Sequence, residues 1–394
     1  MSDLIAIDEA RRRVLGAVRA PAPETVPLAD ALGRVLAEDL ESRLDVPPFV
    51  SSAMDGFAVA AGPAAELPLL GESRAGRPFE GRLEGGAVHI STGAEVPAGA
   101  DAVVPVERSE ASAAGVRLPE TAPGQNVRQA GEDVRAGDVV LTAGMTLGPA
   151  EVAVADSLGR AELTCAARPR VALLVTGDEL AEPGAALGPG QIYSSNGWAL
   201  AGQVAAAGAE VVLRESVGDR ADATRAALER ALGQADVVCV SGGVSVGAHD
   251  HVKAGLAALG VGEIFWGVRL KPGKPTWFGA RGGVLVFGLP GNPVSAMVTF
   301  QLFARPALLA LQGGASEPSR SSAALTAPVR LSPQRAQAVR VRLEENGGGG
   351  WLATPTGEQG SHRLSSMLGA RALAMVPAGD GELGPGERVE LELL

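Results

Sequence analysis

The sequence lacks the features that would place it in several common classes of protein. It has two cysteines in 394 residues, Cys165 and Cys239, too few and too isolated for a disulfide framework or a zinc site. No apolar run reaches the roughly 18 residues that a membrane span needs. The amino terminus mixes charged residues into its apolar positions and has no apolar core of a signal peptide. These absences predict a protein of the reducing cytoplasm that is not inserted into a membrane.

Positive charge is also scarce. The formal net charge is −11, with 34 lysine and arginine residues against 45 aspartate and glutamate residues, and this argues against nucleic acid as a partner. Only three of the basic residues are lysines: Lys253, Lys271 and Lys274. All three follow one glycine-rich segment, residues 241–247, within a short stretch of chain. The sequence therefore predicts an anionic ligand beside that segment.

Several catalytic and nucleotide-binding patterns are absent as well. Gly242, Gly243 and Gly247 do not have the spacing of a dinucleotide-binding fingerprint. Pro275 follows Lys274 where a P-loop has the hydroxyl residue that binds magnesium. No Ser-His-Asp or Cys-His arrangement has a credible spacing, and neither cysteine has a reactive context. Nicotinamide chemistry is therefore disfavoured, as is P-loop chemistry.

The pattern of predicted helices and strands changes along the chain and predicts four domains. Helical patterns at 7–18, 28–40 and 149–158 predict an N-terminal helical and mixed domain. Short β-like runs between them predict an inserted β-rich domain, then strand and helix alternate as in a parallel α/β domain, and a second β module ends the chain. The expected boundaries are 1–47 and 131–168 for the N-terminal domain, 48–130 for the insertion, 169–312 for the α/β domain and 320–394 for the C-terminal β domain.

Within the α/β domain, apolar runs predict four strands and amphipathic patterns predict four helices. The strands are 170–175, 209–213, 235–240 and 283–287, and the helices are 197–207, 221–232, 251–259 and 294–311. Ligands bind outside the carboxyl ends of strands in an open parallel sheet. Three of these strands end in distinctive loops, residues 176–179, 241–247 and 288–293. The glycine and proline residues of any one loop are explained as those of an ordinary turn between a strand and a helix. The three loops together favour a ligand site.

Charged and polar side chains near this edge are candidates for the chemistry. Glu179, Asp219 and Asp250 follow predicted strands, and carboxylates beside a phosphate site commonly bind magnesium or act as general bases. We predict that Asp219 and Asp250 bind Mg²⁺, with helix N-capping as the alternative for both. Lys271 and Lys274 are predicted to contact an anion, with a solvated turn as the alternative.

Two further polar residues have less specific patterns. Asn292, between Pro290 and Pro293, can hydrogen-bond a ligand or its own backbone. Arg340 lies on the polar face of a predicted strand in which Val339, Val341 and Leu343 alternate with charged residues. Its side chain is free to reach a ligand or to stay solvated.

The combination of motifs resembles one family. Residues 31–39, 52–58, 92–94, 131–133 and 176–180 occur in the order seen there, together with the three loops and residues 272–275. The chain is similar to the molybdopterin molybdotransferases, which insert molybdenum in the last step of molybdenum-cofactor synthesis and are related to the C-terminal domain of gephyrin. The similarity runs over nearly the whole chain. It implies a multidomain α/β plus β fold with a central molybdopterin-binding domain and a C-terminal β-barrel-like domain.

The resemblance also implies a reaction and an assembly. The substrates would be molybdate and adenylylated molybdopterin, and AMP would be released with the help of Mg²⁺. A homodimer would share each active site between the α/β and C-terminal domains of one subunit and the inserted β domain of the other. An upstream molybdopterin adenylyltransferase would be a further partner.

Site residues follow from the resemblance and from the loops. The expected catalytic residues are Asp55, Thr92, Glu179, Asp219, Asp250 and Lys271. The expected substrate-binding residues are Ser241, Gly242, Gly243, Ser245, Gly247, Lys274, Pro290, Asn292, Pro293, Asp133, Arg340 and Ser361. The family often has a basic residue where this chain has Gly267, and Arg269 offers a substitute charge. Phe57 stands where the family commonly has tyrosine.

Two functions of other classes remain as alternatives. One is a binding scaffold, as in gephyrin, whose related domain clusters receptors. The other is hydrolysis of a nucleotide pyrophosphate on a similar α/β domain.

Overall fold

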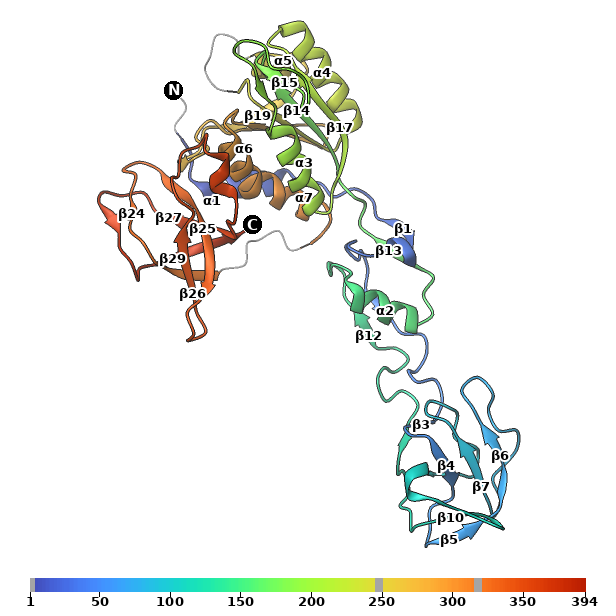
Figure 1. Ribbon diagram of the computed structural model, residues 1–394. Helices are drawn as coiled ribbons and strands as arrows, with labels where there is room; N and C mark the ends of the chain where they lie inside the picture. The colour runs from blue at the N-terminus through green and yellow to red at the C-terminus, as the bar shows by residue number, and fades with distance from the viewer. Residues whose placement is uncertain (1–3, 245–250, 315–320) are drawn as a thin grey trace. The chain divides into compact units, whose positions relative to one another are not determined.

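The computed structural model describes residues 4–244, 251–314 and 321–394, and its chain forms two compact units (Figure 1). The larger unit comprises Met1–Thr25, Gly33–Ala37 and Thr164–Leu394, and the smaller comprises Val26–Leu32 and Glu38–Leu163. Three expected site residues, Ser245, Gly247 and Asp250, lie outside the described residues.

A six-stranded sheet forms the centre of the α/β domain in the larger unit, in the order β17-β14-β18-β22-β21-β19. Its strands are β14 (Arg170–Thr176), β17 (Glu210–Val217), β18 (Val237–Ser241), β19 (Gly262–Trp266), β21 (Trp277–Arg281) and β22 (Val284–Leu289). The four predicted strands are confirmed as the parallel part, β17, β14, β18 and β22. Strands β19 and β21 were not predicted, and β21 runs antiparallel to both of its neighbours.

Helices cover both faces of this sheet. The helices are α3 (Asn196–Ala206), α4 (Ala221–Gln234), α5 (His251–Ala258), α6 (Pro293–Thr299) and α7 (Arg305–Leu311), with the π-helical turn η3 (Phe300–Ala304) between the last two. Side chains of β14 alternate between the faces, as expected for a strand covered on both sides. Val171 and Leu173 pack with α3, α6 and α7, whereas Ala172 and Leu174 pack with α4 and α5.

The stretch from α6 to α7 is apolar because it is part of the core. Residues Pro293–Leu311 are long and apolar enough to cross a membrane, but 78% of the most apolar window is buried inside the protein. Phe300, Leu302 and Phe303 are fully buried there. Burial against the sheet therefore accounts for the composition of this helix.

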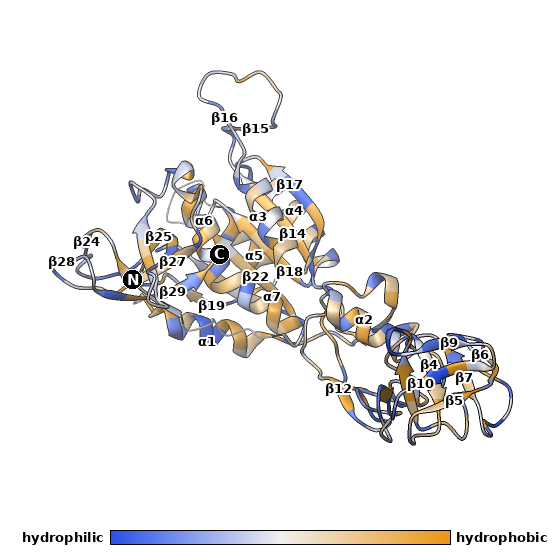
Figure 2. Ribbon diagram, turned by 60° about the horizontal axis from the view of Figure 1, so that its bottom comes forward, coloured by the Kyte–Doolittle hydropathy of each residue, from blue (hydrophilic) through white to orange (hydrophobic). Residues whose placement is uncertain are grey.

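The N-terminal helix α1 (Ile7–Ala17) packs in the core of the α/β domain. Ala10 and Val14 are fully buried, and the Arg11 Nε donates to the Leu302 carbonyl at 3.1 Å. Hydrophilic residues of α1 are blue in Figure 2. This location differs from the expected grouping of residues 1–47 with residues 131–168. The amphipathic pattern indicates that one face is buried, but not which part of the chain covers it.

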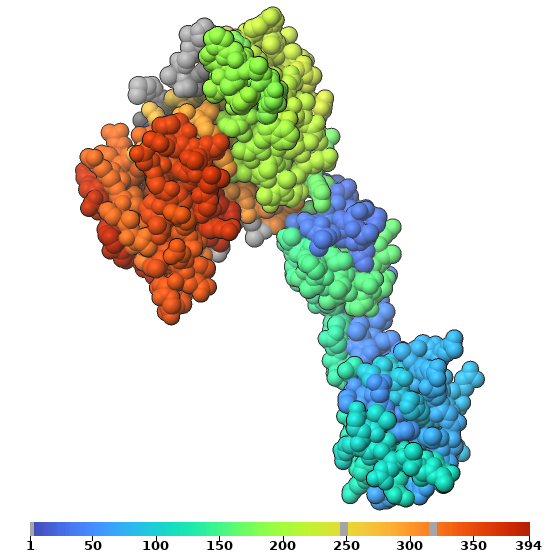
Figure 3. Space-filling view, viewed as in Figure 1, coloured from blue at the N-terminus to red at the C-terminus, as the bar shows by residue number. Residues whose placement is uncertain are grey.

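The C-terminal part of the larger unit is a closed barrel. Its strands are β23 (Ser321–Leu325), β25 (Ala336–Glu345), β26 (Trp351–Pro355), β27 (Ala372–Val376) and β29 (Arg388–Leu393), and the β25–β27 pairing closes the ring. The short strand β20 (Leu270–Lys271) pairs with β25, so the barrel is joined to the segment that carries the lysines. Figure 3 shows the barrel in orange and red beside the green and yellow α/β domain. The barrel-like domain implied by the resemblance is confirmed.

The smaller unit contains the β-rich insertion. A four-stranded sheet has the order β6-β7-β4-β8, and a three-stranded sheet has the order β5-β10-β9. These strands are β4 (Gly56–Val59), β5 (Ala65–Leu67), β6 (Leu69–Ser73), β7 (Ala87–Ile90), β8 (Ala102–Pro105), β9 (Glu110–Ser112) and β10 (Gly115–Leu118). A Cβ at Gly56 would lie 2.0 Å from the Val104 carbonyl oxygen, so the close pairing of β4 with β8 requires glycine there.

The predicted helix 28–40 is wrong. The chain forms only the 3-10 turn η1 (Leu28–Asp30) and the short strand β2 (Leu40–Glu41) in this stretch. Gly33 has a φ of 75°, a conformation that a right-handed helix does not contain. The predicted helix 149–158 is confirmed as α2 (Pro149–Ser157).

The remaining short elements are β1 (Glu24–Pro27), β3 (Ser51–Ser52), η2 (Val106–Arg108), β11 (Val127–Arg128), β12 (Val139–Leu141), β13 (Glu162–Cys165), β15 (Leu180–Ala181), β16 (Ile192–Tyr193), β24 (Val329–Arg330), η4 (Leu364–Met367) and β28 (Glu382–Leu383).

Both cysteines are buried, and this gives a first testable prediction. Burial raises the pKa of the Cys165 thiol and raises the pKa of the Cys239 thiol to about 12. Because the thiolate is the reactive form, we expect neither thiol of the native protein to react with a disulfide reagent at about pH 8. Absorbance of the released thiolate should show both thiols only after denaturation. Rapid labelling of the native protein would contradict this burial.

Candidate active site

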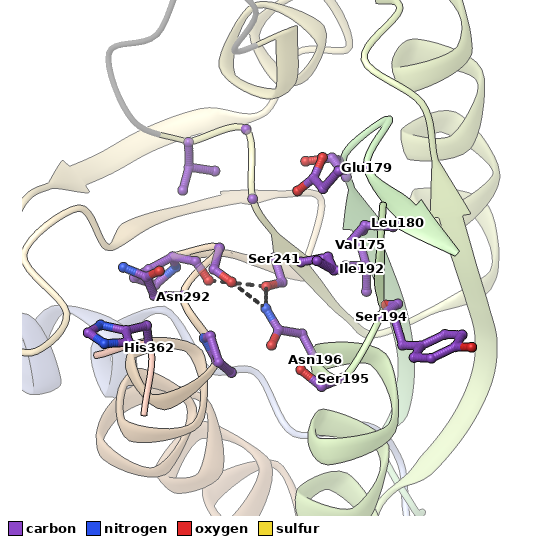
Figure 4. Close-up of a pocket in the computed structure, with 18 of the residues that line it drawn as sticks. Val175, Glu179, Leu180, Ile192, Ser194, Ser195, Asn196, Ser241, Asn292 and His362 are labelled. Atoms are coloured by element: carbon purple, nitrogen blue, oxygen red, sulfur yellow. Dashed lines mark hydrogen bonds between the residues drawn. The ribbon is translucent and has the colours of Figure 1, made fainter. Parts of the chain in front are cut away.

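The sheet places a cavity where its strand order reverses. After β14 the chain adds β17 on one side of β14 and then β18 on the other, and ligands of such sheets bind at this switch point. A cavity of about 620 Å³ opens there, at the carboxyl ends of β14, β18 and β22 (Figure 4). Its lining includes seven of the expected site residues: Glu179, Ser241, Gly242, Gly243, Pro290, Asn292 and Pro293. The structure thus brings the three strand-end loops together.

The two glycines after β18 are required by packing of the loop. Gly242 and Gly243 have φ values of 97° and 64°, which favour glycine. A Cβ on Gly242 would lie 2.6 Å from the Thr176 Oγ1, and one on Gly243 would lie 2.6 Å from a methyl group of Val252. Close contact with β14 and α5 therefore requires these glycines, in addition to any close approach of a ligand.

Asn196 is a cavity residue that the sequence analysis missed. It begins α3 and is only 7% exposed. Its Nδ2 donates to the Ser241 Oγ at 2.8 Å and to the Gly291 carbonyl at 2.7 Å. Three polar residues in a row, Ser194 to Asn196, precede the predicted helix, and this was the one signal that could have identified it.

The rest of the lining is mostly uncharged. Leu180, Ile192 and Tyr193 come from the strand pair β15–β16, and they contribute apolar surface. Among the described lining residues, Glu179 has the only carboxylate and His362 the only imidazole, with no lysine or arginine. Figure 4 shows Glu179 on one side of the cavity and His362 beside Asn292 on the other.

Arg340 is buried, so the alternative in which its side chain stays solvated is wrong. Its side chain is fully inaccessible; its Nε and one terminal nitrogen donate to the Ser366 Oγ at 3.1 and 2.9 Å. Its other terminal nitrogen has no hydrogen-bond partner among the described residues. Burial lowers the pKa of this guanidinium to about 10. Alternation along a strand cannot distinguish solvent from a covering chain segment, here residues 356–366.

That covering segment reaches the rim of the cavity. The Asn292 Nδ2 donates to the Ser361 Oγ at 3.0 Å, and the Val294 N–H donates to the Ser361 carbonyl at 3.2 Å. The Arg340 guanidinium also donates to the Gly360 carbonyl, at 3.3 Å. Arg340 therefore holds the segment through which Ser361 contacts the loop before α6.

None of the three lysines lines the cavity. Lys271 and Lys274 are exposed, and Pro275, the next residue, lines the cavity. The Lys253 Nζ lies 4.9 Å from the centre of the Trp266 ring, a distance typical of a cation–π contact. The Trp266 indole N–H donates to the Val244 carbonyl at 3.1 Å, at the end of the described part of the glycine-rich loop.

Arg269 does not supply the charge that is missing at Gly267. The Arg269 side chain lines a different groove, together with α1 and the barrel. The Arg269 N–H donates to the Ile5 carbonyl, and the Gly267 carbonyl accepts from the Ile5 N–H. A Cβ at Gly267 would lie 2.6 Å from a Leu4 methyl group, so the N-terminal segment occupies the place of a side chain.

Asp219 is half-buried beside the cavity and does not line it. Its N–H donates to the Asp178 Oδ1 at 2.9 Å. The alternative of helix capping is wrong for Asp219, because the residue at the N-cap of α4 is Arg220, without a side-chain cap. Among the described residues, no group of three or more His, Cys, Asp or Glu side chains is arranged to hold a metal ion.

The other expected residues lie in the smaller unit. The Asp55 Oδ1 accepts from the Thr92 N–H at 2.8 Å. Asp133 lines a cavity of about 480 Å³, together with Gly93, Arg128 and Glu132. The structure thus joins Asp55 to Thr92 and places Asp133 in the same cavity as the residue after Thr92.

The fold and the cavity define a multidomain α/β plus β protein with a ligand site at the switch point of its sheet. Three family models match consecutive parts of the chain. Residues 5–159 match the MoeA N-terminal region (domains I and II), residues 172–310 match a probable molybdopterin-binding domain, and residues 322–394 match the MoeA C-terminal region (domain IV). The chain belongs to the MoeA family.

Relatives of known sequence and structure agree. Molybdopterin molybdenumtransferase 2 of Mycobacterium tuberculosis is 38% identical, over 98% of each chain. The molybdopterin molybdenumtransferase of Haemophilus influenzae is 37% identical, over 99% of this chain and 98% of its own. Two crystal structures of a MoeA protein from Pyrococcus horikoshii have TM-scores of 0.86 and 0.83, with 32% and 30% identity. The first match covers 99% of both chains and the second all of both.

Proposed function

We propose that this protein is a molybdopterin molybdenumtransferase, which inserts molybdenum from molybdate into adenylylated molybdopterin and releases AMP. One observation carries the proposal: three strand-end loops form a cavity at the switch point in a chain that matches this family over its full length. The molybdenum is cargo, and the sulfur atoms that receive it belong to the pterin. The protein therefore needs no reactive thiol, in agreement with two buried cysteines.

The chain's own residues hold and orient two anions. Two unit charges 4 Å apart repel by about 4 kcal/mol at an effective dielectric constant near 20. Peptide N–H groups and the side chain of Asn292 would bind the oxygen atoms of the substrates. Ser241 is fully buried and would contribute by holding the loop, since its hydroxyl donates to the Pro290 carbonyl. Lys271 and Lys274, at the margin of the cavity, would lower this repulsion by their positive charge. Glu179, on the other side of the cavity, would serve as a catalytic carboxylate.

Mg²⁺ would help the adenylate phosphate to leave by neutralising its charge. This ion is usually held by one or two carboxylates together with substrate phosphates. The carboxylates at this edge fit such a site, because Asp178 and Asp219 are neighbours in adjacent loops and Glu179 lines the cavity. We assign Asp219 and Asp250 as its ligands.

A homodimer would complete the site. The expected residues fall into two sets in different units, each with a cavity of its own: Asp55, Thr92 and Asp133 in one, the strand-end loops in the other. We propose that the smaller unit of one subunit serves the larger unit of its partner. The substrate would come from an adenylyltransferase in the reducing cytoplasm.

The test is release of AMP from adenylylated molybdopterin by the purified protein. We expect release that requires molybdate, stops when EDTA removes divalent cations and returns on addition of Mg²⁺. Release without molybdate would favour the pyrophosphate hydrolase. Peptide binding without release of AMP would favour the scaffold.

A further inference from the structure

We propose that Asn196 is a positioning residue of this site: its amide fixes the loops after β18 and β22 in the arrangement that turnover requires. The inference rests on the proposed function. The two acceptors of its Nδ2, Ser241 Oγ and Gly291 O, lie 45 and 95 residues away in sequence. The Ser241 hydroxyl in turn donates to the Pro290 carbonyl at 3.1 Å. One buried amide thus joins the start of α3 to two of the three loops (Figure 4).

This network also orients the backbone before α6. The carbonyl groups of Pro290 and Gly291 both point toward the Asn196–Ser241 pair. In a trans peptide the N–H points opposite to the carbonyl, so the N–H groups of Gly291 and Asn292 point the other way. Within the described part of the chain, neither of these N–H groups donates to a protein acceptor. Two successive N–H groups without an acceptor among the described residues suit an oxyanion, and losing Asn196 would release them from this orientation.

The same helix provides a matched control. Gln203 lies seven residues further along α3, two helical turns away and on the same side. Its Nε2 donates to the Met297 carbonyl at 3.1 Å, so it joins α3 to α6 with the same chemical group but does not contact either loop. A purely structural role would give Asn196 and Gln203 similar importance.

The experiment compares Asn196→Ala with Gln203→Ala in the full-length protein. Asn196→Ala loses two hydrogen bonds of the amide and Gln203→Ala loses one, and we expect both to lower the melting temperature. Misplacement of reacting groups by about 1 Å can cost about 100-fold in rate. We therefore expect kcat/KM for adenylylated molybdopterin to fall about 10- to 100-fold in Asn196→Ala, and to stay within about twofold in Gln203→Ala.

Asn196→Asp adds a readout that loss of stability would not produce. An ionised carboxylate has the shape of the amide but cannot donate to the Gly291 carbonyl, whereas a protonated carboxyl can donate once. Burial beside a carbonyl oxygen disfavours the charged carboxylate and should raise the pKa of this carboxyl above its ordinary value of about 3.9. We therefore expect the activity of this variant, relative to wild type, to rise as the pH falls from about 7 to about 5. Asn196→Ala should show no such rise.

The outcomes separate the two proposals. Near-wild-type kcat/KM in Asn196→Ala, or an equal loss in Gln203→Ala, would overturn the positioning role. A wild-type protein that releases no AMP would refute the proposed function instead. Binding of AMP by the same two variants, measured by calorimetry, would then test the role of Asn196. Weaker binding in Asn196→Ala alone would support it, and equal binding in both variants would overturn it.

Discussion

Arg340→Met should abolish most activity while leaving the protein as stable as before or more so. Burial lowers the guanidinium pKa to about 10, and a shift of this size corresponds to roughly 3 kcal/mol that the folded state loses at neutral pH. Methionine fills similar volume without a buried charge, and replacement of buried ionic groups by apolar ones is often neutral or stabilising. The Ser366 hydroxyl keeps a partner, since it also donates to the Arg363 carbonyl at 2.6 Å.

The expected loss of activity has a different cause. Arg340 holds the segment that carries Ser361, and one of its terminal nitrogens is an unused donor among the described residues. Misplacement of binding or reacting groups by about 1 Å can cost about 100-fold in rate, and we expect a fall in kcat of about that size when the segment with Ser361 loses this support. Steady-state AMP release and chemical denaturation measure the two effects on the same sample.

Arg342→Met is the control, because Arg342 lies two residues further along β25 and is exposed. We expect it to change neither activity nor stability appreciably. A large loss of stability in Arg340→Met would show that the guanidinium serves mainly to hold the fold. Activity close to wild type would remove Arg340 from the site.

The sign of the pH dependence follows from the lowered pKa. Between about pH 10 and the ordinary guanidinium pKa, the unfolded chain binds more protons at this group than the folded protein does. The contribution of Arg340 to the free energy of unfolding therefore rises with pH in that window and is constant below it. The difference in stability between wild type and Arg340→Met should narrow only above about pH 10.

Much of the α/β domain could be predicted because its signals are local. Apolar runs and helical periodicity identified the four parallel strands and the helices, and the loops after them indicated the edge where the cavity lies. Strands β19 and β21 were not predicted because neither is an unbroken apolar run: Glu263 lies within β19 and Gly279 within β21. The part of the chain that packs against α1 could not be predicted, because an amphipathic face does not specify what covers it.

The remaining errors concern contacts between residues that are distant in sequence. Asn196 acts through acceptors 45 and 95 residues away, so no local pattern marks it. Arg340 lies on a strand whose alternation is that of a half-exposed sheet, yet a later segment of the barrel covers it. Helix capping was wrong for Asp219 because the chain continues one residue further before α4 begins.

Co-expression of two inactive variants should restore activity if the active site is shared between subunits. Asp55→Asn lies in the smaller unit and Lys271→Ala in the larger unit, and we expect each alone to retain only a few per cent of wild-type turnover. In a mixed dimer, one site combines the two intact units and the other combines both substitutions. Random pairing of equal amounts makes about half of the dimers mixed, so about a quarter of wild-type activity should return.

The control uses two variants of the same unit, Lys271→Ala and Glu179→Gln, both in the larger one. Every site in their mixed dimers keeps one substitution, so co-expression should restore nothing. Recovery of activity in this control would mean that recovery does not depend on combining the smaller unit of one subunit with the larger unit of the other. No recovery with Asp55→Asn and Lys271→Ala, although mass spectrometry detects mixed dimers, would mean that each subunit builds its site alone. The Asp55–Thr92 pair would then act within its own chain. The proposal that the smaller unit contributes to the active site of the partner subunit would be wrong.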